Sequence, residues 1–344
     1  MNLAITGGAG FLGYHLCKGL AQAYDEIFVI DIAPIDPTEY PANVKYFCLD
    51  VRDQEALEKI LKHSTHIIHT AAALPLWKTE DIYDININGT KNVLEIAHRN
   101  KITKVVYVSS TAVYGIPEKH PIEEGDPLIG VGPYGETKIT SEKICLEYRA
   151  KGFCVPIVRP KTFLGTGRLG IFQVLYDWIE SGRKIPVLGD GNNKYQLLEV
   201  EDLVTAIHLL LQGADTKVND TFNVGADEFS TVREDVGALC QYAKSGARVW
   251  PVPSGPVKPF LALFEKMKIS PLYKWIYDTA DKDSYVSIEK IKSTLNWSPR
   301  FSNAQALSKS YQWYLDHKSQ LPTTGVTHRV AWKQGILGVL KRFF

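Results

Sequence analysis

The sequence lacks several features that would place a protein in a specialised class. Lys and Arg number 39 against 38 Asp and Glu, so the net charge of +1 shows none of the basic excess typical of nucleic-acid-binding proteins. Cysteine is scarce, and no two of the five cysteines have the spacing of metal ligands or of a redox pair. This scarcity predicts a reducing compartment and no structural metal. The five are Cys17, Cys48, Cys145, Cys154 and Cys240.

Long apolar runs are also missing. No segment reaches the ~20 apolar residues that a membrane-spanning helix needs. A strand-like pattern already starts at Asn2 or Leu3, and no basic segment of a signal peptide comes before it. We therefore expect a cytoplasmic protein that is soluble or at most attached to a membrane surface.

The C-terminal segment 325–344 contains bases but no acids, because the last acidic residue is Asp316. On a helical wheel its apolar side chains gather opposite Gln334, Lys341 and Arg342. Such a helix can lie in a membrane interface, and it can equally be a last helix that packs on its own domain. Both interpretations stay open. The apolar side chains are Trp332, Ile336, Val339, Leu340 and Phe343.

Apolar residues make up 45% of the chain, and in its first half short apolar runs alternate with amphipathic helical patterns. Near-continuously apolar strands between helices are typical of a parallel sheet that is covered on both faces. We therefore predict an α/β fold with a Rossmann-type doubly wound parallel sheet. The predicted strands are "LAIT", "IFVID", "VKYFCL", "HIIHTA", "KVVYVSS" and "CVPIVRP", and the predicted helices span 11–23, 53–61, 81–99 and 134–150.

After Pro160 the chain becomes richer in glycine, proline and aromatic residues. We predict a dinucleotide-binding domain over 1–160, whose last elements come from 161–225, and a smaller C-terminal α/β substrate lobe over 161–324. Helical patterns continue at 200–212 and 302–316. The second of these begins with the capping box of Ser302 and Gln305.

A glycine-rich turn follows the first predicted strand. Gly7, Gly10 and Gly13 are spaced by three, and a helical pattern comes next, so the phosphates of a dinucleotide can meet the N–H groups at that helix's start. Asp31 ends the second strand, where an acid can accept hydrogen bonds from the adenosine ribose. Residues 31–44 contain no Lys or Arg for a 2′-phosphate, which favours NAD over NADP.

A second constellation combines a tyrosine, a lysine and hydroxyls. Tyr134 and Lys138 are four residues apart in "PYGETK" and therefore share one helix face. A free tyrosine has a pKa of ~10, and a nearby cation favours its phenolate, which can then act as a base. Ser109, Ser110 and Thr111 end a buried strand at the sheet edge where ligands bind, and a hydroxyl there can stabilise charge on a substrate oxygen.

In these motifs the sequence resembles the extended short-chain dehydrogenase/reductase family, which includes the NAD-dependent epimerases and dehydratases and the 3β-hydroxysteroid-dehydrogenase-like enzymes. The matching stretches run in order along nearly the whole chain. They are "TGGAGFLG", "VID", "LDVRD", "HTAA", "NINGT", "SSTAVYG", "PYGETK", "VRP", "VEDLVTAI" and "LNWSPRFS".

The resemblance implies that Tyr134 is the catalytic acid/base, Lys138 its partner and Ser110 the catalytic hydroxyl. It also implies a homodimer formed by helices 81–99 and 134–150. His66 and His69 are more typical of core or strand-end histidines than of catalysts. The cofactor-binding residues that the resemblance implies, besides Tyr134 and Lys138, are Gly7, Gly10, Phe11, Leu12, Gly13, Asp31, Asp50, Val51, Ala71, Ala72, Ala73, Asn86, Ser109 and Pro160.

The substrate is less well defined, because the chain departs from the nucleotide-sugar members of the family. Those members usually carry an Asn shortly after the stretch that reads "VRP" here, and an Arg within the stretch that matches "GDGNNKYQLLEVED". This chain has Lys161 and Thr162 at the first place and Tyr195 and Gln196 at the second. Two phosphates are best bound by arginines and helix starts. The candidate substrate residues are Leu74, Thr111, Lys161, Thr162, Arg168 and Tyr195.

Two further observations bear on the reaction. The 4,6-dehydratases place an Asp-Glu pair after the catalytic hydroxyl, whereas Thr111 and Ala112 stand here. The stretch "PVKPFLALFEKMKISPLYKWIYD" is apolar enough to line an apolar substrate pocket, although a helix that covers the lobe explains its composition equally well. We favour hydride transfer between NAD and a hydrophobic secondary alcohol or ketone, such as a hydroxysteroid or hydroxy-lipid. The alternatives are a nucleotide-sugar 4-epimerase that retains NAD and a non-catalytic NAD-binding regulator.

Overall fold

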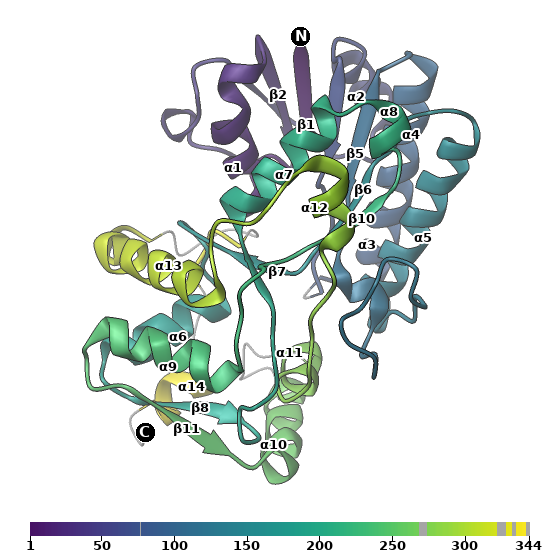
Figure 1. Ribbon diagram of the computed structural model, residues 1–344. Coiled ribbons are helices and arrows are strands. Elements are labelled where there is room, and N and C mark those ends of the chain that lie inside the picture. Colours follow the sequence, from purple (N-terminus) through teal and green to yellow (C-terminus); the bar gives the residue numbers. More distant parts are fainter. Residues whose placement is uncertain (76, 268–273, 322–327, 332–334, 342–344) are drawn as a thin grey trace. The chain divides into compact units, whose positions relative to one another are not determined.

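The computed structural model describes residues 1–75, 77–267, 274–321, 328–331 and 335–341, and Figure 1 shows its helices and strands. The chain divides into two compact units. Unit 1 consists of Met1–Lys161, Val200–Gly225 and Val286–Ser298, and unit 2 of Thr162–Glu199, Ala226–Tyr285 and Pro299–Phe344.

Unit 1 contains a seven-stranded sheet in the order β10-β6-β5-β4-β1-β2-β3, and all its paired strands are parallel. The order reverses between β1 and β4, which makes this a doubly wound sheet, as expected from the sequence. The strands are β1 (Asn2–Thr6), β2 (Glu26–Asp31), β3 (Val44–Cys48), β4 (His66–His69), β5 (Lys104–Val108), β6 (Ile157–Pro160) and β10 (Thr221–Val224).

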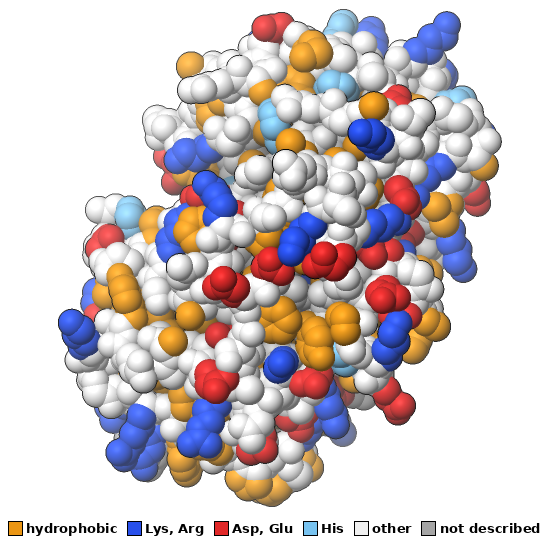
Figure 2. Space-filling view, viewed as in Figure 1, with side chains coloured by type: hydrophobic (Ala, Val, Ile, Leu, Met, Phe, Trp, Pro, Cys, Tyr) orange, Lys and Arg blue, Asp and Glu red, His pale blue; other side chains and the backbone are white. Residues whose placement is uncertain are grey.

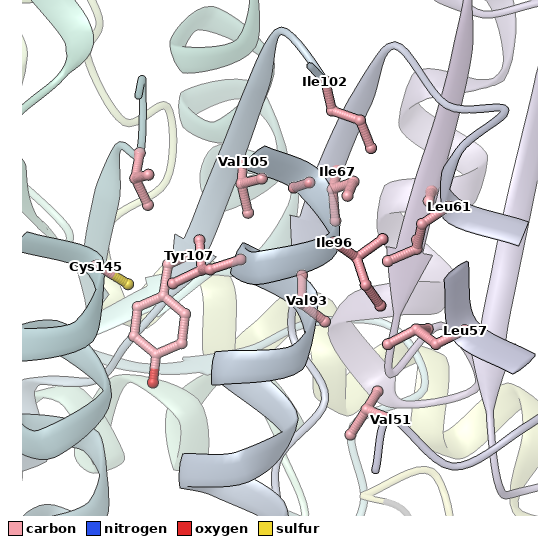
Figure 3. Close-up of a cluster of buried hydrophobic side chains, with 14 of the residues drawn as sticks. Val51, Leu57, Leu61, Ile67, Val93, Ile96, Ile102, Val105, Tyr107 and Cys145 are labelled. Carbon is pink, nitrogen blue, oxygen red and sulfur yellow. The ribbon is translucent and has the colours of Figure 1, made fainter. Parts of the chain in front are cut away.

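The central strands are buried along almost their whole length, because helices cover the sheet. One apolar cluster joins β4 and β5 to three helices through side chains such as Leu57, Val93 and Tyr107, and Figure 3 shows part of it. The three helices are α2 (Gln54–Leu61), α4 (Gly89–Arg99) and α5 (Gly132–Ala150). Elsewhere in the unit, α1 (Phe11–Leu20) packs against α7 (Val200–Gln212), and Gly19 lies so close to Val204 that a Cβ would be 2.6 Å from its Cγ1.

Segments from the second half of the chain complete unit 1. The helix α12 (Glu289–Leu295) packs on β10, where the Lys290 ammonium lies 2.6 Å from the Asp220 carboxylate and over the ring of Phe222. The sequence analysis did not assign residues 286–298 to this unit. The remaining short elements of unit 1 are η1 (Ala21–Ala23), η2 (Pro37–Glu39), α3 (Thr79–Tyr83), η3 (Asp84–Asn88), η4 (Thr111–Tyr114) and α8 (Asp215–Val218).

Several predicted boundaries differ from the observed ones. Asp53 is the cap of α2 and not its first residue, because its carboxylate accepts a hydrogen bond from the Ala56 amide at 3.1 Å. The single helix predicted over 81–99 is α3, a π-helical turn at η3 and α4 in succession. A π turn leaves the apolar periodicity of its flanks almost intact, which explains why the pattern did not reveal it.

Unit 2 contains two small parallel two-stranded sheets, β7 with β9 and β8 with β11. An apolar cluster with Leu164, Tyr176, Trp178 and Tyr311 forms its core. The capping box predicted at Ser302 and Gln305 is present at the start of α13. The elements are β7 (Thr162–Leu164), α6 (Ile171–Glu180), β8 (Lys184–Leu188), β9 (Leu197–Glu199), α9 (Val232–Ala243), β11 (Arg248–Val252), α10 (Ser254–Lys266), α11 (Lys274–Thr279), α13 (Asn303–His317), η5 (Lys318–Gln320) and α14 (Ile336–Leu340).

The described part of the C-terminal segment packs on unit 2. Leu337 is buried in the apolar cluster of this unit, and the Lys341 ammonium pairs with the carboxylate of Asp177 on α6. These contacts favour the helix that packs on its own domain. The predictions for Trp332, Gln334, Arg342 and Phe343 lie outside the described residues.

The charged side chains of both signs are interspersed over the face shown in Figure 2 and do not gather into a single basic patch there. Within the described ranges, none of the helices combines the length and the apolar character that crossing a membrane requires.

Candidate active site

The carboxyl ends of parallel strands lie at one edge of the sheet in unit 1, and most of the predicted site residues follow these ends directly. The glycine turn follows β1, Asp31 ends β2, residues 71–73 follow β4, and Ser109 follows β5. Ligands of doubly wound sheets bind at this edge, next to the point where the strand order reverses.

The glycine turn is built so tightly that side chains would not fit in it. Gly7 has a φ of +73°, and a Cβ there would lie 2.6 Å from the Thr70 hydroxyl oxygen and 2.7 Å from the Ala71 amide nitrogen. A Cβ on Gly13 would lie 2.4 Å from the Gly7 carbonyl oxygen. Gly10 precedes α1 and has no side chain to cap it, which leaves the helix start open to a phosphate.

Asp31 ties the glycine turn to the end of β2. Its carboxylate accepts hydrogen bonds from the Ala9 amide at 3.0 Å and from the Ala33 amide at 2.9 Å. Burial raises the pKa of this carboxyl, and the amide hydrogen bonds partly offset that effect. A carboxylate is an acceptor with no hydrogen of its own, which suits it to receive hydrogen bonds from ribose hydroxyls. The glycine cradle and this acid together fit a dinucleotide such as NAD.

The predicted adenine contacts lie beyond β3. Asp50 binds Arg52 through both carboxylate oxygens, and this hydrogen bonding lowers the pKa of Asp50. Val51 is buried beside Gly89, and a Cβ added to Gly89 would lie 2.6 Å from the Cγ2 of Val51. The Arg52 guanidinium also binds Asp84 at 2.8 Å and so joins the segment after β3 to the π-helical turn.

Asn86 lies in the π-helical turn and is almost fully buried. Its amide oxygen accepts a hydrogen bond from the Ala73 amide at 2.7 Å, and its amide nitrogen donates to the Thr137 hydroxyl at 3.0 Å. The side chain therefore fastens the 71–73 segment to α5. This arrangement suits a residue that shapes the cofactor site through its neighbours, whereas the sequence analysis expected direct contact with the cofactor.

Tyr134 and Lys138 lie one turn apart on α5. The Lys138 ammonium lies 5.9 Å from the centre of the Tyr134 ring and 4.9 Å from that of Tyr107, and it donates a hydrogen bond to the Val108 carbonyl at 2.8 Å. Burial lowers the pKa of Lys138 to about 8, against the opposing effect of the Glu142 carboxylate. The lysine is therefore held at the end of β5 with its charge close to the tyrosine.

Ser110 caps the start of the short turn η4, and its hydroxyl oxygen accepts a hydrogen bond from the Ala112 amide at 3.1 Å. The Thr111 hydroxyl donates to the Pro160 carbonyl at 3.3 Å. The Ser109 hydroxyl donates to the carboxylate of Glu142. Of the three hydroxyls at this strand end, Ser110 therefore keeps its own hydrogen for a ligand, while the other two donate to the protein.

Both histidines of β4 are hydrogen-bonded to hydroxyls of neighbouring elements. His69 is buried between the hydroxyls of Thr6 and Thr90, at 2.6 Å and 3.1 Å, and burial lowers its pKa to about 3. His66 shares a hydrogen bond of 2.9 Å with the Tyr24 hydroxyl.

The predicted substrate residues are divided between the units. Lys161 ends unit 1; it is 3% exposed, its amide donates to the Val224 carbonyl, and burial lowers its pKa to about 7. In unit 2, the Thr162 and Tyr195 hydroxyls lie 3.0 Å apart, and the Arg168 guanidinium lies over the Phe163 ring at 5.6 Å. Leu74 is half-buried after the 71–73 segment of unit 1.

The sequence analysis missed a buried ion pair beside these residues. Glu142 follows Lys138 by one helical turn, and Arg159 comes from β6; their closest oxygen and nitrogen are 2.6 Å apart. The signals were present, since a glutamate at this spacing and an arginine within an apolar strand are both unusual inside a core.

A doubly wound sheet with this glycine turn, an acid at the end of β2 and a Tyr–Lys pair on α5 defines an oxidoreductase of the short-chain dehydrogenase/reductase type. The sequence model of the NAD dependent epimerase/dehydratase family matches residues 3–225, and the chain belongs to this family. It is therefore an enzyme that uses NAD and acts on CH–OH groups.

Known proteins resemble the chain over nearly its whole length. It is 34% identical over 339 residues to the uncharacterized protein y4nG of Sinorhizobium fredii, covering 98% of this chain and 84% of the relative. It is 27% identical to the UDP-glucose 4-epimerase of Lactobacillus helveticus, covering 92% and 98%. The structure of the Thermotoga maritima UDP-glucose 4-epimerase with UDP-glucose superimposes with a TM-score of 0.77 at 21% identity, covering 92% and 100%.

Proposed function

We propose that the enzyme oxidises a secondary hydroxyl of a nucleotide sugar with an NAD that it retains, and returns the product as an epimer. The Tyr134–Lys138 pair, in the same unit as the glycine turn, is the observation that carries the oxidation step. The substrate class rests on the relatives, because the named enzymes to which the chain is similar include UDP-glucose 4-epimerases and dTDP-glucose 4,6-dehydratases, whose names specify nucleotide sugars.

In this proposal the residues of unit 1 handle the proton. The Tyr134 oxygen takes the proton of the substrate hydroxyl, and the ammonium of Lys138 stabilises the phenolate that is ready to accept it. The Ser110 hydroxyl donates to the substrate oxygen and orients it toward Tyr134. Tyr134 returns the same proton when the ketone is reduced again. Bound NAD supplies the hydride acceptor of this chemistry.

The residues after Ser110 separate an epimerase from a 4,6-dehydratase. A dehydratase needs an acid and a base to remove water next to the ketone, and its family pattern places a carboxylate pair here. Thr111 and Ala112 offer no carboxylate, and the Thr111 hydroxyl donates to the Pro160 carbonyl. We therefore propose that the ketone is reduced again and that no elimination occurs.

The hydrophobic substrate favoured in the sequence analysis receives less support. The apolar stretch that was expected to wall a pocket forms α10 and α11 in its described parts, and Phe260 and Leu263 are 60% and 50% exposed. Lys161 and Thr162 in place of the usual Asn still argue for it. We keep a hydrophobic secondary alcohol as the second candidate.

One experiment separates the two candidates. One sample of the purified protein is denatured to measure the NAD that it releases. Other, native samples of the same preparation are given UDP-sugars or, separately, hydroxysteroids and 3-hydroxy lipids. Conversion of a UDP-sugar into its epimer without net NADH, lost in Tyr134→Phe, supports the proposal. Many turnovers of NADH with the apolar alcohols, and no change of any UDP-sugar, would establish the second candidate instead.

Three expectations about the surroundings of the enzyme stay predictions. A homodimer through helices equivalent to 81–99 and 134–150 predicts twice the monomer mass in sedimentation. Cytoplasmic localisation is checked by fractionation. Membrane attachment through 325–344 predicts that deletion of this segment reduces co-sedimentation with liposomes, and unchanged binding would end that idea.

A further inference from the structure

We propose that the buried Arg159–Glu142 pair, with Tyr114, sets the position of the Ser110 turn relative to the helix that carries Tyr134 and Lys138. Arg159, Glu142 and Tyr114 are then positioning residues of the reaction. The inference rests on the proposed function only in that a hydroxyl is oxidised at this site, so it applies to either candidate substrate.

The hydroxyls of Ser110 and Tyr134 come from different elements and must be positioned relative to each other. Ser110 lies in a turn after β5, whereas Tyr134 lies on α5, and both must reach the same substrate oxygen. General acid–base catalysis requires oxygen–oxygen distances of about 2.6–3.2 Å. An error of about 1 Å in such an arrangement can cost about a hundredfold in rate. The two elements therefore need a rigid connection.

Arg159 provides this connection with one buried guanidinium. Its Nε donates to Glu142 at 2.9 Å and its Nη2 at 2.6 Å, so the carboxylate is bound through both oxygens. Its Nη1 donates to the Tyr114 hydroxyl at 2.7 Å and to the Glu124 carbonyl at 3.0 Å. Arg159 and Glu142 are 5% and 2% exposed, and a paired, planar donor of this kind allows little rotation.

Glu142 connects the pair to α5 and to β5. It lies one turn beyond Lys138 and accepts the hydrogen bond of the Ser109 hydroxyl, while Lys138 donates to the carbonyl of Val108. Two side chains on successive turns of α5 are thus bonded to two successive residues at the end of β5. Ser110 is the next residue, so its distance from α5 depends on these bonds.

Tyr114 secures the other end of the Ser110 turn. It is the last residue of η4, its ring lies under the Arg159 guanidinium at 5.0 Å, and its hydroxyl donates to the Asn223 amide oxygen at 2.7 Å. Asn223 belongs to β10, and its backbone N–H donates to the Glu124 carboxylate at 2.8 Å. The turn is therefore held at both ends, by Ser109 and Glu142 on one side and by Tyr114 and Arg159 on the other.

A purely stabilising role is the competing explanation, and a buried ion pair alone argues only weakly for it, because desolvation offsets most of the attraction. Replacing Arg159 or Glu142 leaves the other charge buried without its partner and can prevent folding. Tyr114→Phe is a milder change: it keeps the ring under the guanidinium and removes only the hydroxyl that joins Arg159 to Asn223.

The control is Tyr24→Phe, which removes a comparable buried hydroxyl of unit 1. Tyr24 is 8% exposed and shares its hydrogen bond with His66 at the start of β4, at the opposite edge of the sheet from the proposed site. Tyr114→Phe loses two hydrogen bonds, to Arg159 and to Asn223, and Tyr24→Phe loses one, so the larger loss of unfolding free energy is expected for Tyr114→Phe. Only Tyr114→Phe is expected to change catalysis.

The measurements are kcat and KM with whichever substrate the wild-type enzyme converts, the NAD content of the purified protein and the urea unfolding midpoint. We expect Tyr114→Phe to lower kcat at least about tenfold with KM and NAD content nearly unchanged, and Tyr24→Phe to keep the wild-type kcat. A wild-type kcat in Tyr114→Phe, or an equal loss in Tyr24→Phe, would overturn the inference. Wild-type inactivity on UDP-sugars with activity on apolar alcohols would overturn only the proposed function.

Discussion

The two units differ in how their polar side chains are used. In unit 1 the proposed catalytic groups are held by buried hydrogen bonds to neighbouring elements, such as Lys138 to the Val108 carbonyl and Asn86 to the Ala73 amide. In unit 2, Thr162 lies on the short strand β7, and its hydroxyl bonds to that of Tyr195, which precedes β9. We predict that unit 1 determines the chemical step and that side chains of unit 2 adjust which substrate is accepted.

The sharpest test of this contrast is the loss of the proposed acid/base. Tyr134→Phe should lower kcat by about 10²- to 10⁴-fold, the usual contribution of a positioned proton-transfer group. The NAD content of the purified protein should be unchanged, because the glycine turn and Asp31 are untouched. Turnover and released NAD are measured on the same preparation. A variant with more than a tenth of the wild-type kcat would contradict the assignment of Tyr134.

The same substitution, glycine to alanine, can be made in each unit and allows the two units to be compared. Gly13→Ala places a Cβ 2.4 Å from the Gly7 carbonyl oxygen, so it should destabilise unit 1 and lower NAD affinity at least about tenfold. Gly237 lies inside α9 of unit 2, and apart from the helix's own backbone no atom of the described residues lies within 4 Å of the Cβ that Gly237→Ala adds, so this change should stabilise the helix by up to about 1 kcal/mol.

Thermal unfolding and NAD content distinguish these outcomes. If Gly13→Ala retained full NAD and wild-type stability, the tight turn would not be needed for the cofactor. If Gly237→Ala destabilised the protein, the position would have to contact something beyond the described residues.

The pH dependence of turnover tests the buried lysine. The pKa of Lys138 is lowered to about 8 by burial, so the side chain is a cation below that pH and becomes neutral above it. The proposed mechanism needs the cation, and kcat/KM should therefore fall about tenfold per pH unit above about pH 8. A profile that stays flat to about pH 10 would show that the charge of Lys138 is not required.

The groups around Lys138 support assigning the alkaline fall of kcat/KM to this lysine. Burial lowers the pKa of His69 to about 3, so it is neutral here, and burial raises the pKa values of Cys145 and Tyr107. The Glu142 carboxylate is a charged group that acts on Lys138 and raises its pKa. The other side chain beside the ammonium is the proposed base itself, Tyr134. Lys138→Met should remove the alkaline limb together with most of the activity.

The smallest expected effect is in unit 2. Tyr195→Phe removes the hydroxyl that lies 3.0 Å from that of Thr162, which should cost about 0.5–1.5 kcal/mol of stability. If unit 2 adjusts substrate choice, KM should change several-fold while kcat stays within about twofold. Steady-state kinetics decide the matter: a loss of kcat as large as that of Tyr134→Phe would break the division between the units.

The sequence correctly predicted features that depend on local geometry. The i, i+4 spacing of Tyr134 and Lys138 predicts a shared helix face, and the ammonium indeed lies 5.9 Å from the ring centre. The capping box at Ser302 is equally local and was confirmed. The π-helical turn at Asn86 was missed, because one extra residue in a turn barely alters an apolar pattern.

Residues whose partners are distant in sequence could not be assigned in this way. Arg159 binds Glu142, Tyr114 and the Glu124 carbonyl, which come from three other segments. The addition of residues 286–298 to unit 1 is a similar case, because Lys290 finds its partner Asp220 only after β10 has joined the sheet. No periodicity along the chain records such pairings.

The sequence by itself determined the parallel α/β sheet, the glycine turn with its acid, and the helix face shared by Tyr134 and Lys138. Each of these follows from apolar periodicity or from spacings within one element, which act through local backbone geometry. Only the tertiary structure decided that Asn86 would fasten the 71–73 segment and that Arg159 would join the Ser110 turn to α5. Buried polar groups must find partners wherever the folded chain brings them, so their roles depend on the complete packing of the unit.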